Sequence, residues 1–248
     1  MQMVAITALG VGGATVLGAL IGFLIGKVPH RFNDAILGFA AGVMLAASFV
    51  GLIMPAIEQG GVWISAAGLF CGALFLNMMD KFTPHLHQIA GVDREEHRNN
   101  VALQKVLLFV IAIAIHNLPE GIAAGVSFGN EDVSAALTVA AGIALQNIPE
   151  GMVIIGPLLT SGVSRRRTFV IALATGLVEV AGTFLGYFAV NIATGLLPFA
   201  LAFAGGTMLY VISDEMIPET HAHGYERMAT YSLLAGLVVM LVMDLYIG

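Results

Sequence analysis

The chain has too few charged residues to form a water-exposed surface. Asp, Glu, Lys and Arg make up 10% of its 248 residues, against about 25% in an average soluble domain. Hydrophobic residues account for 58% of the chain, and the mean hydropathy is +0.91. Because polar side chains this sparse cannot cover a soluble fold, the sequence predicts an integral membrane protein.

Cysteine and basic residues are also scarce. The single cysteine, Cys71, excludes an intramolecular disulfide and any zinc motif built from several cysteines. Ten basic residues against sixteen acidic ones give a net charge of −6, so the basic excess that nucleic-acid binding needs is missing. We therefore expect the lipid bilayer as a partner and no nucleic acid.

The chain consists mainly of long apolar runs. A helix needs about 20 apolar residues to cross the hydrocarbon core of a bilayer, and eight runs meet this requirement. We expect an all-α polytopic membrane protein with a single transmembrane domain, residues 1–248. Its eight transmembrane helices are predicted at residues 3–26, 34–56, 62–80, 101–129, 134–160, 168–189, 194–217 and 229–247.

The basic residues predict the orientation of these spans. Every Lys and Arg lies in the first, third, fifth or seventh connection or within a turn of it. The only charged residues in the second and fourth connections are acidic: Glu58, Glu131 and Asp132. The positive-inside rule then makes the odd-numbered connections cytoplasmic and places both termini outside.

The one long connection, residues 81–100, is predicted to be a cytoplasmic loop. It contains His85, His87 and His97. Two interpretations stay open for it: a solvated loop, or a loop that binds metal weakly through its imidazoles.

Four ionisable residues lie near the middle of predicted spans: His116 and Glu120 in the fourth, Glu150 in the fifth and Glu179 in the sixth. An ionisable side chain at this depth costs roughly 2.5–3.5 kcal/mol on insertion scales. The predicted span centres contain no Lys or Arg that could pair with them. A cation from outside the chain, either a metal ion or protons, is the simplest partner.

Three of these four residues belong to a repeated motif. The sequence HNLPEG at residues 116–121 recurs as QNIPEG at residues 146–151. Consecutive spans joined by a short connection run antiparallel, so the two motifs can face each other at the same depth. Helical spacing puts each carboxylate beside the two polar residues that begin its motif. Each proline frees a backbone carbonyl, and each glycine lets another backbone approach closely.

One imidazole, carboxylates and amide oxygens together suit a borderline divalent ion such as Zn²⁺, Fe²⁺, Mn²⁺ or Cd²⁺. Three alternatives stay open at this point: prolines that only kink helices beside protonated carboxyls, a membrane-embedded zinc hydrolase, and a proton channel. Met44, on the second predicted span, is either a packing residue or a soft metal ligand.

These motifs resemble the ZIP (Zrt-, Irt-like protein) family of divalent-metal transporters, most closely its bacterial branch. The resemblance implies a transporter rather than an enzyme, with no cofactor, that carries Zn²⁺ and similar ions into the cytoplasm. It implies alternating access, by movement of a bundle of inner spans against an outer frame, in a multi-pass protein of the inner cell membrane. Family members often form homodimers, which makes a second copy of the chain a candidate partner. The positions that match the family's two-metal site are His116, Asn117, Glu120, Gln146, Asn147, Glu150 and Glu179, with Met44.

Two positions depart from the pattern of some family members, which have histidine at the position of Gln146 or aspartate at that of Asn147. The missing aspartate predicts a weaker second metal position, and whether the site holds one ion or two stays open at this point. On the cytoplasmic side, the residues expected to receive the ion are Asp80, Asp214, Glu215, His221 and His223.

Overall fold

A computed structural model describes residues 1–26, 29–89, 116–129, 132–160, 162–192 and 194–247, which form helices and no strands. A helical segment also covers residues 116–127, at the end of the fourth predicted span. The other helices are α1 (Gln2–Ile25), α2 (His30–Ala46), the π-helix η1 (Ala47–Ile53), α3 (Met54–Ile89), α5 (Val133–Thr160), α6 (Arg165–Ile192), the 3-10 turn η2 (Thr194–Leu196), α7 (Leu197–Val211), the π-helix η3 (Ile212–Met216), α8 (Ile217–Thr220) and α9 (Glu226–Ile247).

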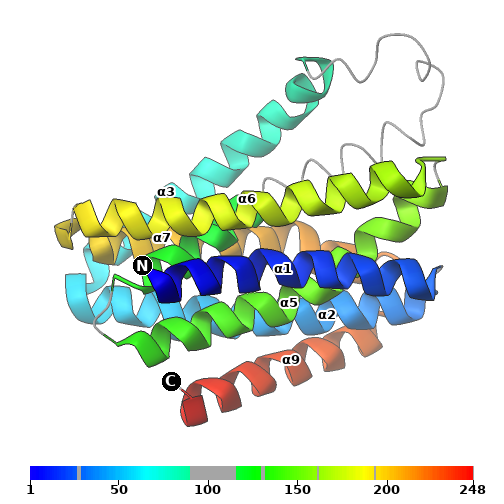
Figure 1. The fold of residues 1–248 in the computed structure, drawn as a ribbon. Coiled ribbons are helices and arrows are strands. Elements are labelled where there is room, and N and C mark those ends of the chain that lie inside the picture. Colours follow the sequence, from blue (N-terminus) through cyan, green and yellow to red (C-terminus); the bar gives the residue numbers. More distant parts are fainter. Residues whose placement is uncertain (27–28, 90–115, 130–131, 161, 193, 248) are drawn as a thin grey trace.

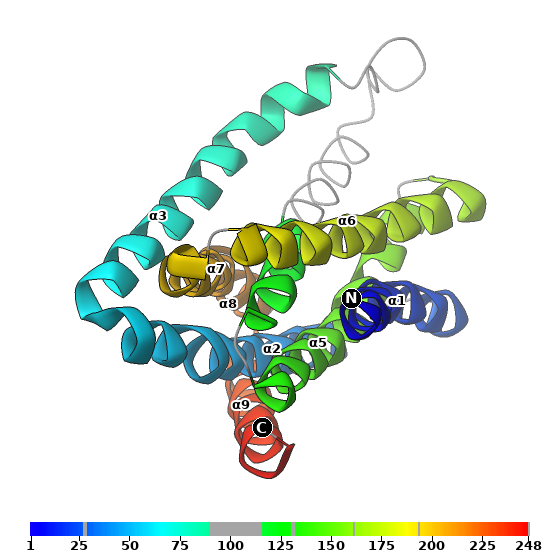
Figure 2. The same ribbon diagram turned by 60° about the vertical axis from the view of Figure 1, so that its left-hand side comes forward.

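Six stretches of the described chain are long and apolar enough to cross a membrane. One of them, His30–Met79, has 50 residues, which is more than twice the length that a single crossing needs. Gly61 interrupts this stretch with a non-helical backbone (φ 76°, ψ 167°), and the chain turns sharply there (Figure 2). The two legs correspond to the second and third predicted spans.

The predicted loop 81–100 begins later than the sequence suggested. Helix α3 continues to Ile89, so the backbone at His85 and His87 is helical, and His97 lies outside the described residues. The mistaken boundary came from the polar composition of residues 81–89. Polar residues are compatible with a helix, and α3 continues through Pro84 in this segment as well.

The helices pack in two groups. In one, α1 lies along α5 and α6; in the other, α3 packs on α7 and α2 on α9, and the two groups meet where α2 packs on α5. The segment 116–127 joins the first group, because Gly121 and Gly125 approach the backbone of α6 while Gly182 and Gly186 approach the segment in return. Small residues four apart allow such close packing in lipid.

Both termini lie at the same end of the bundle (Figures 1 and 2). From there α1 and α5 run to the opposite end, where α2, α6 and α9 begin (Figure 1). The described arginines are all within the first turn of these three helices: Arg31, Arg165, Arg166, Arg167 and Arg227.

Candidate functional site

The two repeated motifs are held in place by close backbone contacts. A side chain at Gly121 would collide with the backbone carbonyl of Glu179 on α6, and one at Gly151 would collide with the carbonyl of Thr15 on α1. The prediction that these two glycines admit another backbone is therefore confirmed. As a result α6 lies directly against the first motif, and α1 lies directly against the second.

Glu179 is the centre of a buried hydrogen-bond network. Its side chain is fully buried, and Thr15 donates a hydrogen bond from Oγ1 to its Oε1 over 2.6 Å. Asn147 donates from Nδ2 to Oε2 over 2.7 Å, and Asn117 donates from Nδ2 to Oε1. Asn147 Nδ2 also lies 3.3 Å from the backbone oxygen of Val11. The carboxylate thus joins α1, α5 and the segment 116–127.

Glu120 lies beside this network. It is 1% exposed, and it is close enough to Glu150 and Glu179 for their charges to repel its own. Gln146 lies against its carboxyl group, yet among the described residues neither side chain makes a hydrogen bond of normal geometry. The oxygens Asn117 Oδ1 and Asn147 Oδ1 are likewise buried without a partner there. Buried oxygens left this way cost free energy, which a bound cation would recover.

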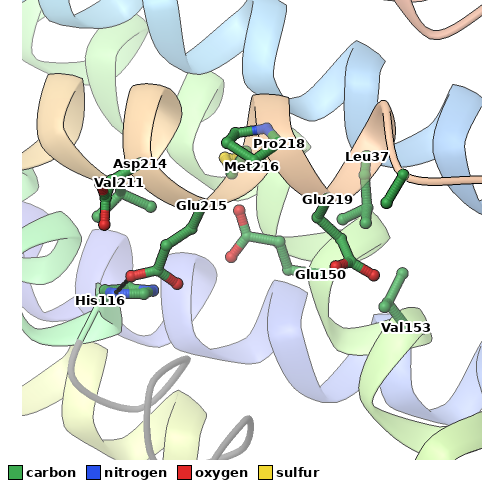
Figure 3. Close-up of a pocket in the computed structure, with 11 residues that line it drawn as sticks. Leu37, His116, Glu150, Val153, Val211, Asp214, Glu215, Met216, Pro218 and Glu219 are labelled. Atoms are coloured by element: carbon green, nitrogen blue, oxygen red, sulfur yellow. Dashed lines mark ion pairs between the residues drawn. The ribbon is translucent and has the colours of Figure 1, made fainter. Parts of the chain in front are cut away.

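His116 and Glu150 connect the buried residues to a cavity. His116 Nε2 lies 2.7 Å from Oε1 of Glu215. Glu150 is close enough to both residues to interact with them electrostatically. Figure 3 shows the Glu150 carboxylate between those of Glu215 and Glu219. All three residues line a cavity of about 470 Å³. Besides these three residues and His116, the lining is Leu37, Val153, Val211, Asp214, Met216, Pro218 and Ala222.

The site residues predicted from the sequence thus have two placements. Seven of them are linked through the contacts above: His116, Asn117, Glu120, Gln146, Asn147, Glu150 and Glu179. Met44 is fully buried in the main hydrophobic cluster, with Ala40, Ala41 and Ile143. In the described part of the chain, no three His, Cys, Asp or Glu side chains are arranged to hold a metal ion, so a metal site here needs the amide oxygens as well.

Two contacts were not anticipated from the sequence. Thr15 lies in an apolar helix for which the sequence indicated no candidate residue. The feature that could have identified it is its position between Gly12 and Gly18 on one helix face. Glu215 was expected further toward the cytoplasm, yet its carboxylate reaches His116. It belongs to the π-helix η3, and the register shift of a π-helix is not evident from residue spacing.

Asp34 also differs from expectation. It is the first residue of the predicted span 34–56, where a carboxylate could meet water, but it is 0% exposed. Its Oδ1 lies 3.0 Å from Nδ1 of His223, and the His223 ring stacks on that of His30 with centroids 4.3 Å apart. These contacts connect α2 to the segment between α8 and α9.

The chain is similar to known proteins along most of its length. The family model of the ZIP zinc transporters matches residues 91–244. The chain is 41% identical to "Zinc transporter GufA" of Myxococcus xanthus, covering 98% of both chains. It is 39% identical to "Zinc transporter ZIPB" of Bordetella bronchiseptica, covering 95% of this chain and 78% of the relative. Human "Zinc transporter ZIP11" is 31% identical, covering 95% and 94%. The chain belongs to the ZIP family of zinc transporters.

Proposed function

We propose that this protein carries divalent transition-metal ions, Zn²⁺ foremost, into the cytoplasm through the site between the repeated motifs. One observation carries the proposal: Glu120, Glu150 and Glu179 are brought together by three separate helical segments in a mostly buried region. Among the described residues, their charged neighbours are other carboxylates and His116, with no Lys or Arg beside them. A divalent cation would neutralise this concentration of negative charge.

The donor set supports a borderline ion. His116 supplies an imidazole nitrogen, Glu120 and Glu150 supply carboxylates, and Asn117, Gln146 and Asn147 supply amide oxygens. Zn²⁺, Fe²⁺, Mn²⁺ and Cd²⁺ accept mixtures of these ligands. Because Asn147 donates to Glu179, it acts as a hydrogen-bond donor at the position where an aspartate would add a second metal ligand. We infer one ion per site, with Met44 as a further ligand only if it moves from its packed position.

The described helices support the eight-span topology. Five helical stretches and the two legs on either side of Gly61 would give seven spans, and we assign the segment 116–127 to an eighth. The described arginines are at the end of the bundle opposite both termini, in line with termini outside the cell and a cytoplasmic connection after α3. The inner membrane is the expected location, and the homodimer stays a prediction.

The division into two packing groups supports transport by alternating access. Apart from Glu215, the linked residues come from α5, α6 and the segment 116–127, with Thr15 from α1, and so belong to one group. The other group contributes Glu215 and part of the cavity wall. The cavity reaches His116 and Glu150 from the side of α8, whereas Glu120 and Gln146 are buried. We interpret this arrangement as open toward the cytoplasm, and movement of the first group against the second would open the site outward.

The test is entry of ⁶⁵Zn²⁺ into proteoliposomes that contain the purified protein in a known orientation. We expect wild-type protein to take up zinc and Glu120→Gln to fall to the level of protein-free liposomes. Glu226→Gln, an exposed carboxylate at the start of α9, is the matched control and should transport normally. Unchanged uptake by Glu120→Gln would refute the site, and proton flux through the wild type without metal would favour a channel instead.

A further inference from the structure

The residue that α1 contributes to the network is Thr15, and its surroundings explain how it reaches Glu179. Gly12 meets the backbone of α6 at Gly176, and Gly18 meets the backbone of α5 at Ile148. Thr15 lies midway between these two glycines on the same face of the helix. It is 1% exposed, and its hydroxyl donates a hydrogen bond to Glu179 Oε1, with 2.6 Å between the two oxygens.

The three donors to Glu179 determine which way the two asparagine side chains face. A carboxylate accepts hydrogen bonds and cannot donate them, so Asn117 and Asn147 must present their NH₂ groups to Glu179. Their oxygens Oδ1 then face away from the carboxylate, and both are buried with no hydrogen-bond partner among the described residues. Glu179 therefore holds one amide oxygen from each repeated motif ready to accept a cation.

Thr15 completes this arrangement because it shares Oε1 with Asn117. The hydroxyl fixes the rotation of the carboxylate from the α1 side, while the two asparagines contact it from the opposite motifs. Hydrogen bonds to a charged acceptor are about twice as strong as neutral ones. Without the hydroxyl, only the two asparagine amides hold the Glu179 carboxylate, and the direction of the Asn117 amide is less firmly fixed.

We propose that Thr15 is a positioning residue for ion binding, acting through Glu179 to orient the amide oxygens of Asn117 and Asn147 toward the transported ion. The inference rests on the proposed function of the site. In this arrangement Thr15 does not touch the ion. Glu179 contributes its negative charge and orients the two asparagine amides through the hydrogen bonds it accepts from them. The hydroxyl contributes to affinity for the ion, and the movement of the helices does not depend on it.

The experiment measures the KM and Vmax of ⁶⁵Zn²⁺ uptake in proteoliposomes for Thr15→Val and Thr15→Ser. Valine keeps the shape of threonine and removes the hydroxyl; serine keeps the hydroxyl and removes the methyl group. We expect Thr15→Val to raise KM about tenfold, the effect of one hydrogen bond to a charged group, with Vmax within about twofold of wild type. Thr15→Ser should behave as wild type. If Thr15→Val does not fold, Thr15→Ala, which adds no bulk, takes its place with the same expectation.

A packing role for Thr15 predicts the reverse order, with Thr15→Ser impaired and Thr15→Val normal, and that order would overturn the inference. So would a fall in Vmax at unchanged KM. Thr175→Val is the matched control, because Thr175 is equally buried but donates to the carbonyl of Ala172 in its own helix; its KM should not change. Wild-type uptake by Glu120→Gln would refute the proposed function itself, whereas loss of uptake in Glu120→Gln with an unchanged Thr15→Val would refute this inference alone.

Discussion

The contact between α6 and the first motif can be tested by adding a single methyl group at Gly182. A Cβ at this position would lie 2.6 Å from the backbone oxygen of Leu118 and 3.1 Å from Cα of Gly121. Nonbonded carbon atoms are normally about 3.5 Å from their neighbours. The substitution Gly182→Ala must therefore move the segment 116–127 and α6 apart by roughly 1 Å, because both sides of the contact are backbone.

This displacement has a cost in stability and a cost in transport. Overpacking of this kind destabilises by about 1–3 kcal/mol, against a gain of up to about 1 kcal/mol from replacing glycine by alanine in a helix. Gly156→Ala on α5 receives the same helical gain and meets nothing within 4 Å, so it is the matched control. Since Glu179 lies one turn before Gly182, the displacement also separates it from Asn117. Misplacement by about 1 Å in a positioned site can cost up to about 100-fold, and we expect uptake to fall at least about tenfold.

The assays are the midpoint of thermal unfolding in detergent and ⁶⁵Zn²⁺ uptake in proteoliposomes. Gly182→Ala should unfold at a lower temperature than Gly156→Ala, by about 2–4 °C for each kcal/mol in a chain of this size. Two results would refute the reasoning: normal stability and uptake in Gly182→Ala, or equal damage in Gly156→Ala. A loss of stability with full uptake would show that the contact supports the fold without positioning the site.

Three further predictions concern the cavity, the contact between Asp34 and His223, and selectivity. Glu215→Gln should lower the Vmax of zinc uptake several-fold with little change in KM, because an ion that leaves His116 meets this carboxylate first. Glu219→Gln, further along the same cavity wall, should lower Vmax less. Equal kinetics in the two variants would contradict this order. His223→Ala should lower the unfolding temperature because it leaves the buried carboxylate of Asp34 without its partner. The double variant with Asp34→Asn should regain part of this loss in unfolding temperature. Additive losses from the two substitutions would argue against an interaction between His223 and Asp34. In competition assays Cd²⁺, Fe²⁺ and Mn²⁺ should reduce ⁶⁵Zn²⁺ uptake, whereas Mg²⁺ and Ca²⁺ at the same concentration should not, since an imidazole favours transition metals. Inhibition by Mg²⁺ would count against His116 as a ligand.

Much of the fold follows from hydropathy, because a bilayer constrains helix length directly. The apolar runs predicted α1, α5, α6 and α9 to within three residues at each end. Hydropathy says less about where a helix stops outside the bilayer, so the polar residues 81–89 were assigned to a loop although α3 continues through them. The π-helices η1 and η3 were also missed, because a single inserted residue leaves the hydropathy of a span unchanged.

The residues of the site were accessible from the sequence for a different reason. Mid-span carboxylates are costly, so Glu120, Glu150 and Glu179 stand out even in a single sequence. Thr15 does not, because a threonine in an apolar helix usually bonds to its own backbone. Thr175 and Thr183 do so in α6.

The distinction between these threonines shows what the sequence could not supply. A hydroxyl takes part in the site when a neighbouring helix comes close enough to offer a better acceptor than its own backbone. For Thr15 this closeness depends on Gly12 and Gly18, whose partners are Gly176 and Ile148 on two other helices. In the proposed site, the motifs on α5 and the segment 116–127 supply the ligands to the ion, and the glycines of α1 bring in the residue that aligns them. A substitution on this face of α1 should therefore affect ion affinity even though none of its side chains binds the ion.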